Sequence, residues 1–226
     1  MDQLQFITTA DGSKTIFHPE VGEHYHSVNG AVQESRHVFL ESGLQHFLKQ
    51  GVSAVSVLEV GFGTGLNFLL SAEYCLDNHI NLQYTGIEAF PLAHVMIRQS
   101  GYDKYVCKET WELFITKYED ALQKGILFSP SIQLEIVQLK ASGFETNKRF
   151  DVLFYDAFSA GAQPEMWTYQ ILGHICYYLN PGGLFVTYAF NGNLKHNMTT
   201  LGFILEKVSG AHGKREMLRA TKIYTH

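Results

Sequence analysis

The 226-residue chain has few of the features that mark disulfide-rich, membrane-spanning or secreted proteins. Its three cysteines, Cys75, Cys107 and Cys176, are far apart and form no Cys-x-x-Cys pair, so neither a disulfide framework nor a zinc site is expected. The longest strictly apolar run, 175–179, is far shorter than the about 20 residues of a bilayer span. The first residues lack the basic start and apolar stretch of a signal peptide, so we expect a cytoplasmic protein that does not contact a membrane.

The chain also lacks a strong excess of either charge, because its net charge is only −5 and charged residues make up 17% of it. This balance argues against a protein whose whole surface coats nucleic acid. Residues 195–226, however, hold six basic and two acidic side chains. Within them Lys214, Arg215 and Arg219 are candidate phosphate contacts, although a solvated face would explain the same residues.

The composition is otherwise that of a globular protein, with 46% hydrophobic and 13% aromatic residues. A chain of this length predicts one large domain that needs neither disulfides nor a metal to fold. Residues 1–50 are expected to form an extension packed on the core. In it, two β-favouring runs flank Asp11-Gly12 as a hairpin, and a helix follows over 31–49.

From residue 51 to 226, short β-branched runs alternate with longer amphipathic segments. Because each parallel crossover needs a helix, the alternation predicts an α/β fold with a mostly parallel, Rossmann-like sheet. Residues 203–207 and 217–223 predict a terminal antiparallel hairpin. This layout resembles the class I S-adenosylmethionine-dependent methyltransferases. The expected strands are 54–60, 82–87, 132–137, 151–155 and 184–188, and the expected helices are 66–78, 92–99, 109–123 and 168–179.

A glycine-rich loop joins the first of these strands to a helix. Glycines at this point let the backbone approach a ligand, and the helix start offers free amide groups. The spacing differs from the dinucleotide fingerprint, since the third glycine comes one position early and Glu59 would repel a pyrophosphate. S-adenosylmethionine instead carries an ammonium group that Glu59 could face, and Glu88, after the next strand, could accept the ribose hydroxyls. The alternative is that the glycines form only a tight turn and that Glu59 and Glu88 are solvated charges. The expected cofactor-binding residues are Glu59, Gly61, Phe62, Gly63, Thr64, Gly65, Asn67, Glu88, Asp156 and Ala157.

The strand 151–155 delivers Asp156-Ala157-Phe158 to the carboxyl edge of the sheet, where ligands of open α/β sheets bind. A polar group followed by an aromatic resembles the acceptor loop of methyltransferases that act on exocyclic amines. Asp156 is the candidate catalytic residue, because a fixed carboxylate would stabilise positive charge developing on the attacking nitrogen. A structural loop cap is the alternative for Asp156. Phe62, Phe158 and Trp167 could stack on a base or belong to the core.

Motifs across nearly the whole chain resemble the tRNA methyltransferases that form 5-methylaminomethyl-2-thiouridine at the wobble position. The matching segments are 9–13, 25–27, 30–31, 34–39, 61–67, 156–158, 163–167 and 213–220. The resemblance implies methyl transfer from S-adenosylmethionine to the aminomethyl nitrogen of the uridine, with Asp156 facing it. It also implies binding of the tRNA anticodon region and coupling to the enzymes that build the aminomethyl group. The implied substrate-binding residues are Tyr25, Ser27, Glu34, Phe158, Gln163, Pro164, Trp167, Lys214, Arg215 and Arg219.

Three positions depart from this family: Ala160 replaces a proline, Asn191 a lysine, and Lys140 stands near a usual acid.

The first two alternatives to a tRNA methyltransferase are a methyltransferase and an aminopropyltransferase that act on a small amine. The third is a non-catalytic tRNA- or cofactor-binding protein. His24 and His26 would share a strand face, but no third ligand is evident nearby, so no metal is expected.

Overall fold

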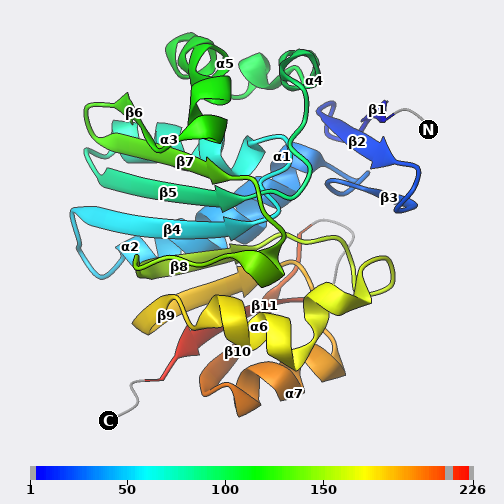
Figure 1. The fold of residues 1–226 in the computed structure, drawn as a ribbon, viewed down its shortest axis with the longest axis vertical. Helices are drawn as coiled ribbons and strands as arrows, with labels where there is room; N and C mark the ends of the chain where they lie inside the picture. Colours follow the sequence, from blue (N-terminus) through cyan, green and yellow to red (C-terminus); the bar gives the residue numbers. More distant parts are fainter. Residues whose placement is uncertain (1–3, 212–215, 224–226) are drawn as a thin grey trace.

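The computed structural model describes residues 4–211 and 216–223, and its centre is an eight-stranded sheet (Figure 1). The strand order is β10-β11-β9-β8-β4-β5-β7-β6. Neighbouring strands from β9 to β7 pair in parallel, whereas β6, β11 and β10 each pair antiparallel with a neighbour. The mostly parallel sheet and the terminal hairpin are therefore confirmed. The strands are β4 (Ala54–Val60), β5 (Asn81–Ile87), β6 (Ile126–Ser129), β7 (Ile132–Val137), β8 (Phe150–Tyr155), β9 (Leu179–Thr187), β10 (Phe203–Ser209) and β11 (Glu216–Lys222).

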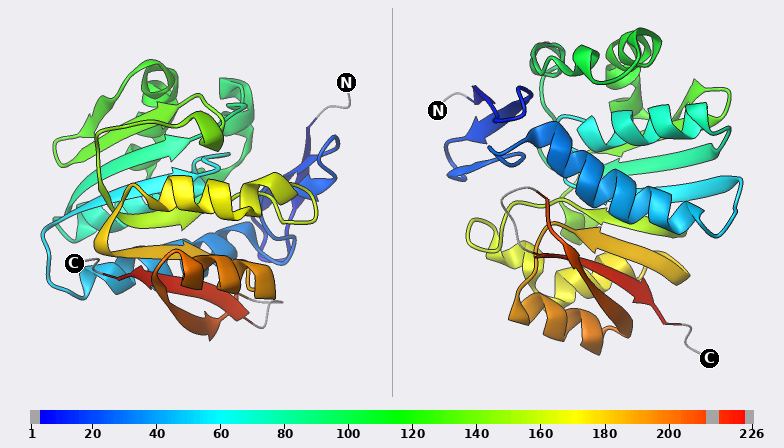
Figure 2. Two further views of the ribbon diagram at one scale, coloured as in Figure 1. Left: turned by 60° about the horizontal axis from the view of Figure 1, so that its bottom comes forward. Right: turned by 180° about the vertical axis from the view of Figure 1, so that it is seen from behind.

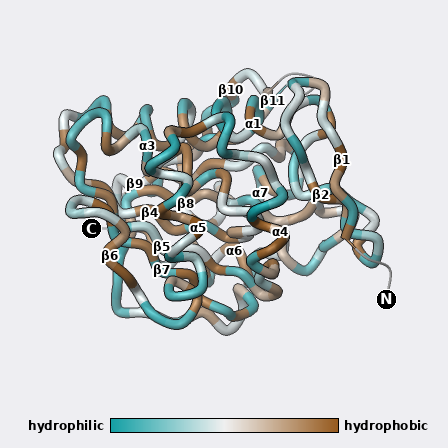
Figure 3. Tube along the Cα trace, turned by 90° about the horizontal axis from the view of Figure 1, so that it is seen from above, coloured by the Kyte–Doolittle hydropathy of each residue, from teal (hydrophilic) through white to brown (hydrophobic). Residues whose placement is uncertain are grey.

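Helices cover both faces of this sheet (Figures 1 and 2). On one face lie α3 (Leu66–Asp77) and a long N-terminal helical segment, and on the other lie α6 (Tyr169–Cys176) and α7 (Gly192–Thr200). Alternate residues of β4 enter the two cores, with Val57 in one and Leu58 in the other. In Figure 3 the hydrophobic stretches follow the central strands. Among the described residues, none of the helices has the length and apolarity to cross a bilayer.

The remaining helices are α4 (His94–Gln99) and α5 (Lys108–Gln123), with short 3₁₀ turns between elements. The single turns are η2 (Tyr102–Lys104), η3 (Ala141–Gly143) and η4 (Pro164–Trp167). Among the described strands and α-helices after residue 50, two were not predicted. Strand β6 is only four residues long, and α7 lacks a strong apolar periodicity, although Asn191 provides a cap signal at its start, where its side chain accepts a hydrogen bond from the Leu194 amide.

The N-terminal extension forms a separate three-stranded sheet before its helix. Strands β1 (Gln5–Thr8) and β2 (Lys14–His18) make the predicted hairpin, and β3 (Glu23–His24) adds to β2. In Figure 1 this sheet lies beyond the carboxyl ends of β4 and β5. It therefore stands where ligands of α/β sheets bind.

The helix expected over 31–49 is present, but its middle is wider than an α-helix. It consists of α1 (Ala31–Glu34), the π-helical η1 (Ser35–Gln45) and α2 (His46–Leu48). Gly43 in η1 lies against β8 and β9, because a Cβ atom there would be 2.9 Å from the Phe154 ring and 3.1 Å from Val186. The lack of a side chain at this position lets the helical segment approach the sheet closely.

Candidate active site

A cavity of about 750 Å³ opens at the carboxyl ends of β4, β5 and β8. Gly61, Glu88 and Asp156, each the first residue after one of these strands, all line it. Its volume is in the range of small-molecule and cofactor sites. The far wall comes from the N-terminal sheet and the loop after it, through His18, Glu20, Val21, Tyr25 and His26.

The glycine loop has little room for side chains on its cavity side. Gly61 has φ +87°, and a Cβ atom there would be 2.4 Å from the carbonyl oxygen of Asp156. At Gly63, with φ +52°, a Cβ atom would be 3.0 Å from Tyr25 Cδ1. The absence of a side chain thus lets the backbone at Gly61 pack against that of Asp156 and keeps Gly63 clear of the Tyr25 ring, and this cradle fits a nucleoside cofactor.

Glu88 is held at the cavity wall by two backbone amides. Its Oε2 atom accepts a hydrogen bond from the Gly63 amide at 2.8 Å, and Oε1 accepts one from the Phe90 amide at 3.0 Å. Each carboxylate oxygen can accept more than one hydrogen bond, so Glu88 can still receive a pair of hydroxyl groups. The geometry is compatible with the expected ribose contact, which stays a prediction.

Glu59 is not among the residues that line the cavity, and its expected contact with the cofactor's ammonium group stays a prediction. The residue is 0% exposed, and its carboxyl accepts hydrogen bonds from Asn67 Nδ2 at 2.7 Å and from Tyr84 Oη at 2.8 Å. Burial, followed by the charge of Asp156, raises the pKa of Glu59 well above its usual value. The carboxyl lies behind the glycine loop because this face of β4 packs against α3.

Three more residues of the loop motif also point inward rather than toward a ligand. Phe62 packs against Gly86 and the ring of Phe68, and it is 2% exposed. The Thr64 hydroxyl is buried and bonds Tyr102 Oη at 3.3 Å, while a Cβ atom on Gly65 would meet Phe114. None of these three residues lines the cavity, so they shape the loop from behind, and their expected contacts with the cofactor stay predictions.

Asp156 lies beside the glycine loop (residues 61–65) and begins the loop after β8 (residues 156–163), which we call the acceptor loop. Its amide donates a hydrogen bond to the carbonyl of Val60 at 2.9 Å, which ties β8 to β4 just where both strands end. Its Oδ2 atom accepts a hydrogen bond from Asn67 Nδ2 at 2.8 Å. Asp156 and Ala157 both line the cavity, as expected.

Aromatic rings form the wall next to Asp156. The ring of Phe158 meets that of Tyr25 edge-on at 5.3 Å and that of His18 at 6.0 Å. Tyr25, Phe158 and Gln163 line the cavity, so three of the proposed substrate contacts are brought to one place from the extension and the acceptor loop. Burial and the charge of Glu88 raise the pKa of Tyr25, so its hydroxyl is neutral.

Four other expected substrate contacts lie outside the cavity lining and support it instead. Ser27 donates its amide to Glu34 Oε1 at 3.0 Å, which closes the loop before α1. Trp167 is buried and donates Nε1 to the carbonyl of Phe158 at 2.8 Å. Pro164 begins the η4 turn. None of the four lines the cavity, and their expected contacts with the substrate stay predictions.

The basic C-terminal candidates divide in two. Lys214 and Arg215 lie outside the described residues. Arg219 is in β11, and its guanidinium pairs with Glu206 of β10 at 2.6 Å with 14% of the side chain exposed. Its expected contact with a phosphate stays a prediction, and Glu206 on the neighbouring strand already pairs with its guanidinium.

The three departures from the family pattern fall in different places. Lys140 lines the cavity, where it adds a positive charge. Asn191 caps α7, and Ala160 lies in an exposed turn of the acceptor loop. Only the first of these three thus lies where it could alter binding in the cavity directly.

Contacts from the extension were missed by the sequence reasoning. Glu23 of β3 accepts hydrogen bonds from both the amide and the hydroxyl of Ser159, the amide at 2.9 Å. These two hydrogen bonds, which we call the Glu23–Ser159 clasp, hold the acceptor loop against the N-terminal sheet. The two residues are 136 positions apart in the sequence. No local signal reveals a pair so far apart. Within the described part of the chain, no group of three or more His, Cys, Asp or Glu side chains could hold a metal ion.

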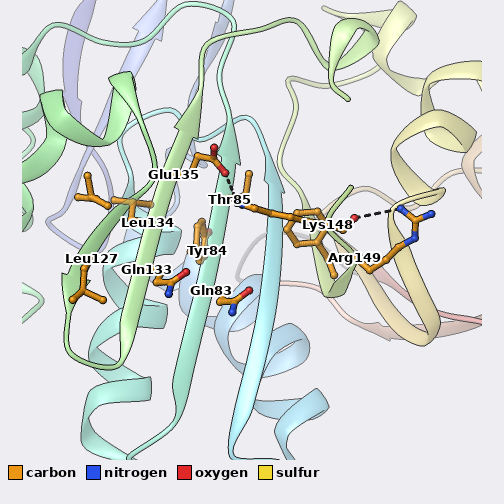
Figure 4. Close-up of a pocket in the computed structure, with 12 residues that line it drawn as sticks. Gln83, Tyr84, Thr85, Leu127, Gln133, Leu134, Glu135, Lys148 and Arg149 are labelled. Atoms are coloured by element: carbon orange, nitrogen blue, oxygen red, sulfur yellow. Dashed lines mark hydrogen bonds and ion pairs between the residues drawn. The ribbon is translucent and has the colours of Figure 1, made fainter. Parts of the chain in front are cut away.

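A second pocket, of about 310 Å³, lies against strands β5 and β7 (Figure 4). Figure 4 shows Gln83 and Gln133 along these strands, and Lys148 paired with Glu135. Gln83 and Gln133 belong to the first halves of their strands, away from the carboxyl edge where Asp156 lies. The glycine loop and Asp156 therefore mark the larger cavity as the candidate active site.

The strand order, the glycine loop and the cavity at the carboxyl edge together define a class I methyltransferase fold. The chain belongs to the family described as S-adenosyl-L-methionine-dependent methyltransferase, which matches residues 106–223. S-adenosylmethionine is the cofactor of this family.

Individual relatives confirm the resemblance that the motifs indicated. The "tRNA 5-methylaminomethyl-2-thiouridine biosynthesis bifunctional protein MnmC" of Methylobacillus flagellatus is 27% identical over 87% of this chain and 32% of its own length. The protein of the same name from Magnetococcus marinus is 28% identical over 94% of this chain and 34% of its own. This chain thus spans about a third of these relatives. The crystal structure of MnmC2 from Aquifex aeolicus has the same fold, with a TM-score of 0.80 and 21% identity, covering 100% of this chain and 72% of that one.

Proposed function

We propose that this protein transfers the methyl group of S-adenosylmethionine to the aminomethyl nitrogen of 5-aminomethyl-2-thiouridine in tRNA, which yields 5-methylaminomethyl-2-thiouridine. The names of the relatives support this substrate. The observation that carries the proposal is the position of Asp156, which lies between the glycine loop and the aromatic wall of Phe158 and Tyr25.

The residues of the cradle fit the cofactor. The backbone at Gly61 and Gly63, the carboxylate of Glu88 and the backbone at Ala157 would hold it in the cavity. When bound, S-adenosylmethionine supplies an electrophilic methyl group on a positively charged sulfur. The cavity suits such a cation, because the four acidic residues among the described residues that line it, Glu20, Glu88, Asp156 and Glu165, outnumber the single lysine, Lys140.

Asp156 acts on the acceptor amine in a way that its charge permits. An alkylamine has a pKa near that of lysine, about 10.4, so presenting the neutral amine at pH 7 costs roughly 4–5 kcal/mol. A nearby carboxylate makes that deprotonation harder. Asp156 therefore contributes in the transition state, where it stabilises the positive charge that develops on nitrogen and orients the lone pair for attack.

The aromatic wall would hold the nucleobase. Bases of single-stranded RNA loops are recognised largely by stacking on aromatic side chains, and the wobble base lies in such a loop. Phe158 and Tyr25 are the available rings at the cavity. We further propose that Lys214 and Arg215 contact tRNA phosphates, and that the enzymes that build the aminomethyl group act before this one.

Incubation with methyl-labelled cofactor and tRNA carrying the unmethylated aminomethyl group tests the proposal. Label is expected in the tRNA, and nucleoside analysis should show it as the methylaminomethyl derivative. Label only in added polyamines or other small amines would instead support a small-amine transferase. Transfer of an aminopropyl group would appear as a different mass increase. Tight binding of tRNA and cofactor without any turnover would indicate that the protein is a non-catalytic binding protein.

A further inference from the structure

One buried amide group connects the glycine loop to the acceptor loop. Asn67 Nδ2 donates to Glu59 Oε1 at 2.7 Å and to Asp156 Oδ2 at 2.8 Å. An amide nitrogen carries two hydrogens, so each hydrogen serves one of the two carboxyl groups. Asn67 is 3% exposed and Glu59 is 0% exposed, so water does not compete for the hydrogen bond between them, whereas Asp156 lines the cavity.

The backbone brings these three residues together from different elements. Glu59 is the penultimate residue of β4, and it is level with Phe154 on the parallel neighbour β8. Asp156 follows the end of β8, and Asn67 lies in the first turn of α3, above both strand ends. The glycine loop sets the distance between strand and helix, so its length also determines where the amide lies.

The orientation of the Asn67 amide follows from its surroundings. Its Oδ1 atom is buried and has no hydrogen-bond partner among the described residues. The opposite orientation would aim this oxygen at two carboxyl groups and forfeit both hydrogen bonds. On the other side of the Glu59 carboxyl, Tyr84 Oη donates a hydrogen bond to Oε2 at 2.8 Å, so both carboxyl oxygens are fixed in place.

We propose that Asn67 is a positioning residue for methyl transfer: anchored by Glu59, its amide holds the Asp156 carboxylate in the orientation in which it faces the acceptor nitrogen. The inference rests on the proposed function, since it assumes that Asp156 acts on the amine. A catalytic group must be held close to its productive geometry, and a buried supporting hydrogen bond does this for a carboxylate at the start of a loop.

The first experiment compares steady-state kinetics of single variants. In Asn67→Ala we expect kcat to fall about ten- to a hundredfold, the effect of losing a hydrogen bond to a charged group, with the KM for S-adenosylmethionine changed less than about threefold. Glu59→Ala should lose activity in the same way. Glu59→Gln keeps an acceptor oxygen for the amide and should restore most of that loss. A rise in KM with kcat unchanged would overturn the proposal.

A matched control comes from the same helix. Asn78, at the carboxyl end of α3, also donates its Nδ2 atom, to the carbonyl of Tyr74 at 2.8 Å, but it is remote from both carboxyls. Asn78→Ala should leave kcat and KM near the wild-type values. Equal losses in Asn78→Ala and Asn67→Ala would mean that weakening α3, rather than releasing Asp156, reduces activity, and would overturn the proposal.

A double-mutant cycle separates positioning from an independent role. In the Asp156→Ala background, Asn67→Ala should reduce kcat by less than about twofold, because no carboxylate is left to position. If Asn67→Ala lowered kcat by the same factor in the Asp156→Ala background as in the wild type, the proposal would be overturned.

A stability cycle keeps the inference separate from the proposed function. Should the wild-type protein fail to methylate tRNA, the proposed function falls, but urea unfolding of the same variants still tests the link. The double variant Asn67→Ala, Asp156→Ala should shift the unfolding midpoint by less than the sum of the two single shifts. Additive shifts would show that the side chains do not act as a unit and would overturn the inference.

Discussion

The carboxylates of Asp156 and Glu88 lie in the same cavity but have different neighbours and should have separable effects. Asp156 accepts from a side-chain amide, whereas Glu88 accepts from two backbone amides of the cofactor loop and the segment after β5. If the proposed function is correct, the first arrangement would orient a carboxylate toward the acceptor amine, and the second would present a fixed carboxylate to the cofactor.

Asp156→Ala is expected to lower kcat about a hundredfold or more with little change in cofactor affinity. The reason is that the carboxylate stabilises charge present mainly in the transition state. Single-turnover rates with labelled cofactor and calorimetric titration check the two halves of this expectation. Near-normal turnover would remove Asp156 from the mechanism.

Glu88→Ala is expected to weaken binding of S-adenosylmethionine about ten- to a hundredfold, because the ribose hydroxyls would lose hydrogen bonds to a charged acceptor. Isothermal titration calorimetry measures the change directly. Glu165, which also lines the cavity but follows the acceptor loop, is the matched control: Glu165→Ala should alter cofactor affinity much less. Unchanged affinity in Glu88→Ala would disprove the ribose assignment.

At the scale of elements, the N-terminal sheet is a wall of the cavity rather than an appendage. It contributes lining residues from β2 and the loops around β3, and Glu23 of β3 clasps Ser159 of the acceptor loop. The loop is thus held from two sides, by Trp167 from within and by Glu23 from the extension.

Glu23→Ala should loosen the acceptor loop while leaving the fold intact. Two hydrogen bonds to a carboxylate are lost, and residues 157–163 should become more accessible to proteases. Limited proteolysis followed by mass spectrometry of the cleavage sites tests this. Glu41→Ala, which removes an exposed carboxylate of η1, serves as the control and should not alter the cleavage pattern. Identical loop cleavage in Glu23→Ala and wild type would contradict the clasp.

At the scale of the whole molecule, the buried carboxyl of Glu59 makes stability depend on pH. Its pKa is raised in the folded state by burial and by the charge of Asp156, whereas in the unfolded chain it should be near the ordinary value of 4.5. The folded state therefore binds the proton more tightly. The resulting stabilisation is complete below pH 4.5 and is lost as the pH rises toward the folded-state pKa.

The glutamine variant isolates this contribution. Glu59→Gln cannot ionise, so its free energy of unfolding relative to wild type should increase as the pH rises from about 4.5 toward neutrality. Urea unfolding at several pH values measures the difference, with Asn78→Ala as a variant that should show a constant offset. A difference between Glu59→Gln and wild type that does not change with pH would contradict the raised pKa.

Much of the fold could be predicted because its signals are local. The period of apolar residues predicted β4, β5, β7 and β8 within a residue or two, and the spacing of Gly61, Gly63 and Gly65 marked the loop. Short elements such as β6 escaped, since four residues carry too little pattern. The π-helical widening of η1 also escaped, because Gly43 and the sheet beneath it determine that shape.

The sequence by itself determined the α/β alternation, the glycine loop and the acid at each strand end, because backbone conformation and hydrophobic period depend on near neighbours. Only the tertiary structure decided which acids face the cavity. Glu59 is buried by α3, Arg219 is paired by β10, and Ser159 is held by Glu23 of the extension. Exposure and pairing of a charged group depend on which distant segments pack around it, and that information exists only once the chain has folded.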